Sequence, residues 1–160
     1  MKAGKFLGAW LSYVLVTFAM GFVWHLIIFK KLYEELAIFS RINDPIIPLG
    51  FAAMLIQGAI LAYLFPRLCR GGHPILEGIR FGLLTGVLIA SSAVLAEAAK
   101  QRVTSLPTWL VLESSYYLIQ FGLSGILIAY VYRNSTKAAR KSIWTPRQQE
   151  TRRPSPQNKE

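Results

Sequence analysis

Four long runs of apolar residues, separated by short polar segments, fill the first 132 residues of the chain. A helix rises about 1.5 Å per residue and the hydrocarbon layer of a bilayer is about 30 Å thick, so roughly 20 apolar residues are needed to cross it. Each run reaches about this length. The pattern predicts transmembrane helices over about residues 5–30, 46–66, 75–99 and 108–132.

The segments between these runs carry the residues that end helices. Pro45 lies where the second helix should begin, Gly71 and Gly72 separate the second from the third, and Pro107 precedes the fourth. Residues 30–44 mix charges of both signs with apolar positions, a spacing that favours a short helix at the membrane surface. The sequence predicts an all-α fold, a four-transmembrane-helix bundle formed by residues 1–132.

The first apolar run begins behind two lysines, as a secretory signal peptide does, but it is much longer than a signal core of about 7 to 15 residues. We therefore expect it to be retained as a helix. Residues 133–160 are basic and contain three prolines but few apolar side chains, which predicts a flexible basic tail.

Composition and charge agree with a membrane protein. Apolar residues make up 53% of the chain and charged residues only 16%, and the net charge is +10. Eight of the 18 Lys and Arg residues follow the last apolar run, where they form a flank rather than a groove for nucleic acid, so we expect no nucleic-acid partner.

The distribution of basic residues predicts the orientation. With four spans, thirteen Lys and Arg residues fall on the side of the termini and five on the other. Basic residues near spans favour the cytoplasm and bind anionic lipid headgroups. We expect both termini to be cytoplasmic, and the tail to contact anionic lipid.

Ionisable and aromatic residues from three helices fall at one depth near the predicted outer surface. They are His25 of the first helix, Glu97 of the third, and Glu113, Tyr116 and Tyr117 of the fourth. Charges in lipid are costly, so we expect His25 and Glu113 to face each other inside the bundle, with Glu97 close enough to join them. This layer could hold a cation, relay a proton or bind a small cationic solute; alternatively, the carboxylates only neutralise nearby basic residues.

Two further features predict how the helices pack. Gln57 and Gln120 lie near the midplane, where a hydrogen bond between them would satisfy both amides. Gly78, Gly82 and Gly86 follow each other at intervals of four, which predicts a close packing face, either inside the bundle or between protomers.

The sequence leaves three classes of function open. Motifs of soluble enzymes, such as a phosphate-binding glycine loop or a zinc-protease helix, are missing. We expect a non-catalytic accessory or structural membrane protein, acting as a homo-oligomer or with a partner membrane protein. The alternatives are a small oligomeric transporter of a cation, a proton or a small cationic solute, and a membrane enzyme that uses the outer His/Glu layer. Any metal or other cofactor stays undetermined.

Two segments resemble a known family. Residues 21–25, of sequence GFVWH, are followed by Phe29, Lys30 and Tyr33, while Tyr116 and Tyr117 lead to Gly122 and Gly125. These segments resemble the first and last helices of a small four-helix bacterial membrane protein family of unknown function, the DUF1761-like proteins. The resemblance implies a four-helix membrane protein, and we expect it to lie in a bacterial inner membrane. It carries no functional residues over.

Overall fold

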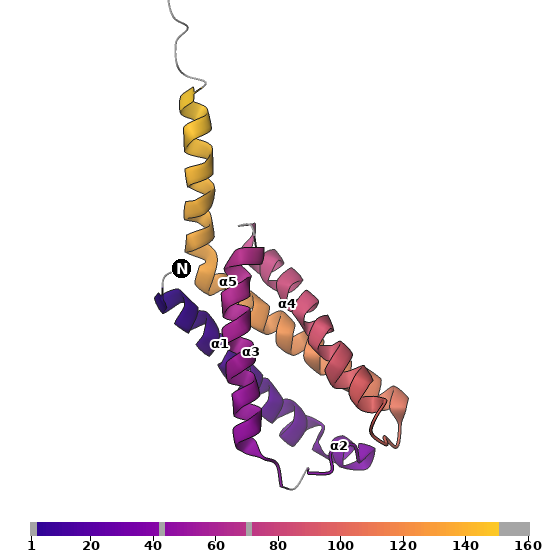
Figure 1. Cartoon of the computed structure of the whole chain (residues 1–160). Coiled ribbons are helices and arrows are strands. Elements are labelled where there is room, and N and C mark those ends of the chain that lie inside the picture. The colour runs from indigo at the N-terminus through magenta and orange to yellow at the C-terminus, as the bar shows by residue number, and fades with distance from the viewer. Residues whose placement is uncertain (1–2, 42–43, 70–71, 151–160) are drawn as a thin grey trace, which may run out of the picture.

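The structure, a computed structural model, describes residues 3–41, 44–69 and 72–150, with side chains up to Arg133. All regular elements of this part of the chain are helices (Figure 1). In order they are α1 (Ala3–Gly21), the π-helical segment η1 (Phe22–Ile28), α2 (Lys30–Leu36), α3 (Ile47–Leu68), α4 (Pro74–Ala90), the π-helical segment η2 (Ser91–Ala96) and α5 (Leu106–Glu150).

Four of these helical stretches are long and apolar enough to cross a membrane: Ala3–Ile28, Ile47–Leu68, Pro74–Ala96 and Leu106–Arg133. Many of their large apolar side chains are exposed, as expected where lipid rather than water surrounds the protein. The all-α, four-span fold predicted from the sequence is confirmed, and the chain has the architecture of an integral membrane protein.

The helix α5 contacts each of the other three long helices. α1 packs against both α3 and α5, and α4 packs along α5 (Figure 1). α3 meets α4 where the rings of Phe65 and Phe81 lie 5.2 Å apart. One apolar core, which contains Tyr13, Phe65 and Phe121, fills this part of the bundle.

Both ends of the four-span region lie at the same end of the bundle. A Cβ built on Gly8 of α1 would lie 3.5 Å from Val131 near the last described side chain of α5. We call this the terminal end, and the opposite one, where α2 lies, the α2 end. A second core, which contains Tyr33, Leu36, Val94 and Trp109, occupies the α2 end.

The glycines of α4 line its seam with α5. A Cβ on Gly78 would lie 2.6 Å from the Cα of Ile126 and 2.7 Å from the carbonyl oxygen of Gly125, and a Cβ on Gly82 would overlap the carbonyl oxygen of Phe121. The two backbones therefore touch directly, which only residues without a side chain permit. The predicted packing face lies inside the bundle, between two helices of one chain.

The last helix is longer than predicted. α5 runs from Leu106 to Glu150, whereas the apolar pattern placed its end at residue 132. The sequence after Arg133 contains alanines, lysines and arginines, all good helix formers, so the helix can continue without packing. Residues 151–160 of the predicted flexible tail lie outside the described residues, and its flexibility stays a prediction.

Candidate functional site

Glu113 is the centre of a buried polar cluster at the α2 end. Its side chain comes from the second turn of α5, and the residue is 4% exposed. The hydroxyl of Tyr33 donates a hydrogen bond to Oε2, and Nε2 of His25 lies 3.7 Å from Oε1. Both carboxylate oxygens thus face groups from other helical segments, η1 and α2.

His25 is placed by the π-helical segment η1. The wider turn is seen where the amide of Phe29 donates to the carbonyl of Trp24, five residues back, at 3.0 Å. An extra residue in a turn shifts the helical register, and such segments occur often at functional sites. Within η1 only Trp24 and His25 are half-buried, while the apolar side chains around them are exposed.

The contacts of the His25 ring define where its protons can be. Nδ1 lies 3.1 Å from the carbonyl oxygen of Gly21, which can only accept, so Nδ1 carries a proton. Nε2 then faces Glu113, and this contact is favourable when one further proton is present, either on the imidazole or on the carboxyl group. The pair links η1 to α5.

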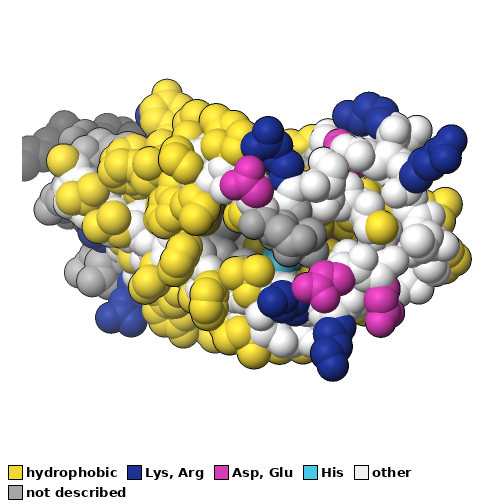
Figure 2. Space-filling view, turned by 90° about the horizontal axis from the view of Figure 1, so that it is seen from below, with side chains coloured by type: hydrophobic (Ala, Val, Ile, Leu, Met, Phe, Trp, Pro, Cys, Tyr) yellow, Lys and Arg dark blue, Asp and Glu magenta, His cyan; other side chains and the backbone are white. Residues whose placement is uncertain are grey.

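Aromatic rings surround the histidine. The rings of Tyr33 and Tyr116 have their centroids 4.6 Å from that of His25, and Phe39 lies 6.5 Å away. The electron-rich face of such a ring attracts a protonated imidazole, whereas the ring edge is electropositive and does not. The His25 side chain is 24% exposed, and Figure 2, which looks at the α2 end, shows a histidine in a hollow among basic and acidic side chains.

Tyr33 reaches Glu113 because α2 is folded against the end of the bundle. This helix has only seven residues, too few to be stable alone, and it is held by the buried side chains of Tyr33 and Leu36. Its last turn is fastened to the loop before α5. The amide of Thr104 donates to the carbonyl of Leu36 at 3.3 Å, and the Thr104 hydroxyl to that of Glu35 at 2.7 Å.

Burial and the carboxylate of Glu113 both raise the pKa of the Tyr33 phenol above its ordinary value. The phenol therefore stays protonated over the physiological pH range and remains a donor to the carboxylate.

The structure brings together most of the predicted polar layer. His25 and Glu113 face each other, as expected, and Tyr116 packs edge-on against the histidine. Tyr117 lies next to Tyr116 on α5. Its ring centroid is 5.3 Å from that of Tyr116 and 6.1 Å from that of Phe121. Glu113, Tyr116 and Gln120 are buried, so the predicted inward direction of the polar stripe on α5 is confirmed.

Glu97 does not join the site. Its Oε1 accepts a hydrogen bond from Gln101 at 2.7 Å and its Oε2 lies 3.3 Å from the Lys100 ammonium, all at the exposed start of the loop after η2. The hydrogen bond from Gln101 and the nearby Lys100 hold the pKa of the Glu97 carboxyl below its usual range. The prediction that it completes the layer is wrong, because local partners in water cost less than burial of a second carboxylate.

The midplane glutamines also have other partners than predicted. The hydroxyl of Tyr13 donates to Oε1 of Gln57 at 2.7 Å, and Nε2 of Gln120 donates to the hydroxyl of Thr17 at 2.7 Å. Each amide bonds to a hydroxyl group of α1, so the direct bond between the two amides that was predicted is not made. Both still join helices, as was expected of them, but they do so through the hydroxyl groups of α1.

Sequence reasoning missed Tyr33 and Trp109 as parts of this site. The indole of Trp109 donates to the carbonyl of Val94 in η2 at 3.2 Å, and its ring lies 6.5 Å from that of Tyr33. The signal that could have identified Tyr33 is its place on a charged surface helix next to a predicted buried carboxylate. The π-helical turns leave no such signal in an apolar run.

Within the part of the chain that the structure describes, no three His, Cys, Asp or Glu side chains converge on a point where a metal ion could bind. The chemistry that the cluster offers is exchange of a proton between imidazole and carboxylate. Comparison of the chain with family models, curated proteins and solved structures found no match. The resemblance to the DUF1761-like family therefore stays a prediction.

Proposed function

We propose that this chain is a non-catalytic, multi-pass membrane protein with an accessory or structural role. The observation that best supports this role is the internal pairing of the buried polar groups. Both oxygens of Glu113 face groups of the same chain, and Gln57 and Gln120 bond to α1. Buried polar groups that are satisfied within the bundle join its helices, and this use favours a packing role.

Affinity purification from the source membrane in mild detergent tests this role. We expect one membrane protein to co-purify in fixed stoichiometry, and chemical cross-links to connect it to the exposed apolar faces of the spans. The purified chain alone, placed in liposomes, should not change their proton permeability. A chain that purifies without any partner and conducts protons would overturn the proposal.

A small proton-linked transporter is the second candidate, and the His25–Glu113 pair favours it. Imidazole and carboxylate are groups that can relay a proton, and the histidine side chain is 24% exposed at the α2 end. Proteoliposomes with an internal pH-sensitive dye distinguish the two roles. Transport predicts a proton flux that Glu113→Gln abolishes, while an accessory role predicts the same background leak for the wild type and for this variant.

We also propose that both termini lie in the cytoplasm and that the membrane is the bacterial inner membrane, with the basic tail on anionic lipid. Lys5, Arg67 and Arg133 belong to the terminal end, whereas the α2 end mixes Lys30 and Lys31 with acidic residues. Basic residues concentrate on the cytoplasmic side of membrane proteins. Reporter fusions at residue 160 and within residues 37–46 test this, and an external C-terminus would contradict it.

A further inference from the structure

Helix α3 carries a second face beside the one that packs on α1. The first face contacts α1 closely, since a Cβ built on Gly58 would lie 2.8 Å from the ring of Tyr13 and 2.9 Å from that of Trp10. Next to it, residues follow each other at alternating intervals of three and four. We call this set the Gln57 face of α3; its members are Gly50, Ala53, Gln57, Ile60 and Leu64.

Most of the Gln57 face is uncovered. Gly50, Ala53 and Ile60 are exposed, and a Cβ on Gly50 would meet nothing within 4 Å. Alternating intervals of three and four keep residues on one stripe of a helix, and two helices that pack side by side at a small angle use this spacing. Small residues in the stripe let a second backbone approach closely. The face therefore has the geometry of a helix-packing surface.

Gln57 places a free polar group in the centre of this face. It lies close to the middle of the span Ile47–Leu68, and its Oε1 accepts a hydrogen bond from the Tyr13 hydroxyl at 2.7 Å. Among the residues that the structure describes, its amide nitrogen has no acceptor. The unpartnered polar atoms of Trp24 and Ser124 are enclosed, whereas the half-buried Gln57 leaves its nitrogen within reach of a group outside the chain.

The surroundings of Gln57 limit what that group is. Neither lipid tails nor the hydrocarbon layer offer an acceptor at this depth, and an unpaired amide there is costly. A second glutamine fits, because a carboxamide both donates and accepts. All copies of a membrane protein insert in one orientation, so two α3 helices related by a two-fold axis run parallel, and each residue of the face meets its counterpart.

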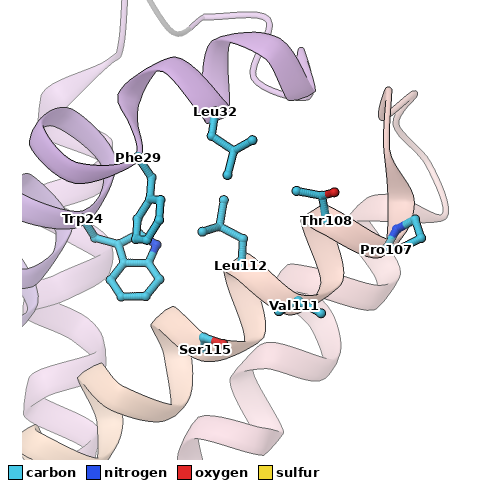
Figure 3. Close-up of a pocket in the computed structure, with 8 residues that line it drawn as sticks. All are labelled: Trp24, Phe29, Leu32, Pro107, Thr108, Val111, Leu112 and Ser115. Carbon is cyan, nitrogen blue, oxygen red and sulfur yellow. The ribbon is translucent and has the colours of Figure 1, made fainter.

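The open groove at the α2 end differs from this face. Trp24, Leu32 and Val111 are among the residues that line it, and Figure 3 shows that its walls are mostly hydrocarbon. The indole nitrogen of Trp24 is enclosed, and the Thr108 hydroxyl pairs with that of Ser105 at 2.8 Å. Lipid tails can cover such walls without a specific contact, so the Gln57 face is the surface that favours a partner of defined chemistry.

We propose that two copies of this chain associate through the Gln57 face of α3, with the amide of each Gln57 hydrogen-bonded to the other. Each amide donates one bond across the axis and accepts one, and Gly50 and Ala53 let the two backbones come close. This dimer goes beyond the accessory role proposed above, since it forms from the purified chain alone, with or without another membrane protein.

The first test measures contact between copies in liposomes by disulfide formation. In a Cys69→Ser background, Ala53→Cys should give a cross-linked dimer on mild oxidation, because the two Cβ atoms lie near the axis. Ala52→Cys is the matched control: it is also exposed, but the next residue of a helix points about 100° away. We expect the dimer to form at least ~5-fold faster at residue 53 than at residue 52.

The second test measures affinity by energy transfer between labelled copies as the ratio of protein to lipid is varied. Gln57→Leu should weaken association about 5- to 10-fold, the equivalent of two hydrogen bonds of the usual strength within membranes. Tyr13→Phe is its control, because it removes the bond within the chain but leaves the amide in place. This variant should associate at least as well as the wild type.

The third test adds volume to the face. Gly50→Leu should weaken association at least ~10-fold, because the backbones no longer approach. Gly122→Leu on α5 is the matched control, since a Cβ there also meets nothing within 4 Å, and it should associate like the wild type.

Equal cross-linking at residues 52 and 53 would overturn the proposal, as would equal association by Gly50→Leu and Gly122→Leu. A loss in Tyr13→Phe as large as that in Gln57→Leu would show that Gln57 acts only within its own chain. All three tests use the purified chain without any other protein. Their failure therefore leaves the search for a partner membrane protein unaffected, and the two proposals can fail separately.

Discussion

The α4–α5 seam and the α2 end are held together by different means. Along the seam, Gly78 and Gly82 of α4 touch the backbone of α5 directly, and this close packing is possible because glycine has no side chain. At the α2 end, the contacts are made by functional groups, with Tyr33 and His25 on Glu113 and Thr104 on the last turn of α2. The comparison indicates that the seam depends on the absence of side-chain volume, whereas the α2 end depends also on the protonation of the groups that pair there.

Added volume in the seam should have the largest effect. Gly82→Ala places a methyl group against the carbonyl oxygen of Phe121 and forces the two backbones apart. We expect the free energy of unfolding in detergent to fall by about 2 to 3 kcal/mol. The matched control is Gly122→Ala on α5, because a Cβ there meets nothing within 4 Å. Equal stability of the two variants would show that the seam is not as tight as described.

Loss of the Tyr33 hydroxyl should have the next largest effect. Tyr33→Phe keeps the ring but removes one hydrogen-bond donor from the buried Glu113 carboxylate. The free energy of unfolding should therefore fall by about 1 to 3 kcal/mol. Hydrogen exchange of residues 30–36 should also become faster, because α2 loses one of its hydrogen bonds to the rest of the bundle. Tyr63→Phe is the control, since Tyr63 is 49% exposed. A loss of the same size in both variants would contradict the role of the hydroxyl.

Alkaline pH should act on the α2 end and spare the seam. The folded-state pKa of Tyr33 is raised above the value of 10.0 of a free tyrosine, mainly by burial and then by Glu113. A raised pKa stabilises the protonated folded state, so this stability is complete below about pH 10 and is lost as the pH rises further. Glu113, His25 and Tyr116 are the titratable groups that face this phenol.

The measurement is the free energy of unfolding between about pH 9 and pH 11, compared with Tyr33→Phe. The difference between wild type and variant should shrink by up to ~1.4 kcal/mol per pH unit above about pH 10. The Gly82→Ala difference should stay constant over the same range. A parallel decline in wild type and Tyr33→Phe would show that the phenol is not protected in the folded chain.

A smaller effect is expected from the midplane, where each of the two glutamines bonds to a hydroxyl group of α1. A double-mutant cycle between Tyr13→Phe and Gln57→Leu should give a coupling of about 0.6 kcal/mol, the usual size for such bonds within membranes. The cycle between Gln57→Leu and Gln120→Leu should give almost none. Strong coupling between the glutamines would restore the direct bond that the sequence predicted.

The smallest effect should come from the end of α2. Ala37 follows this helix with a positive φ of 53°, a conformation that costs an L-residue about 1 to 2 kcal/mol and glycine very little. Ala37→Gly should therefore raise the free energy of unfolding by about 0.5 kcal/mol, since glycine also loses more entropy on folding. Ala53→Gly, inside α3, should lower it by about 1 kcal/mol. A loss in both variants would contradict the strain at Ala37.

The sequence by itself determined the membrane fold and the direction of its buried faces. The length of the apolar runs determined the four spans, and the spacing of four residues between the glycines of α4 determined the seam with α5. The helical periodicity of α5 placed Glu113 and Gln120 on its buried face. These features follow from periodicity and from the cost of polar groups in lipid, which act within one helix. His25 and Glu113 could be paired in advance because both lie at one depth and each avoids lipid.

Only the tertiary structure decided which partners the polar groups take. The packing of α1 against both α3 and α5 gives Gln57 to Tyr13 and Gln120 to Thr17. The docking of α2 brings the Tyr33 hydroxyl to Glu113, and the π-helical turns of η1 set the positions of Trp24 and His25. Glu97 pairs instead with nearby Lys100. The reason is that a hydrogen bond depends on distances of a few tenths of an ångström between separate helices, which hydrophobic periodicity along one helix does not encode.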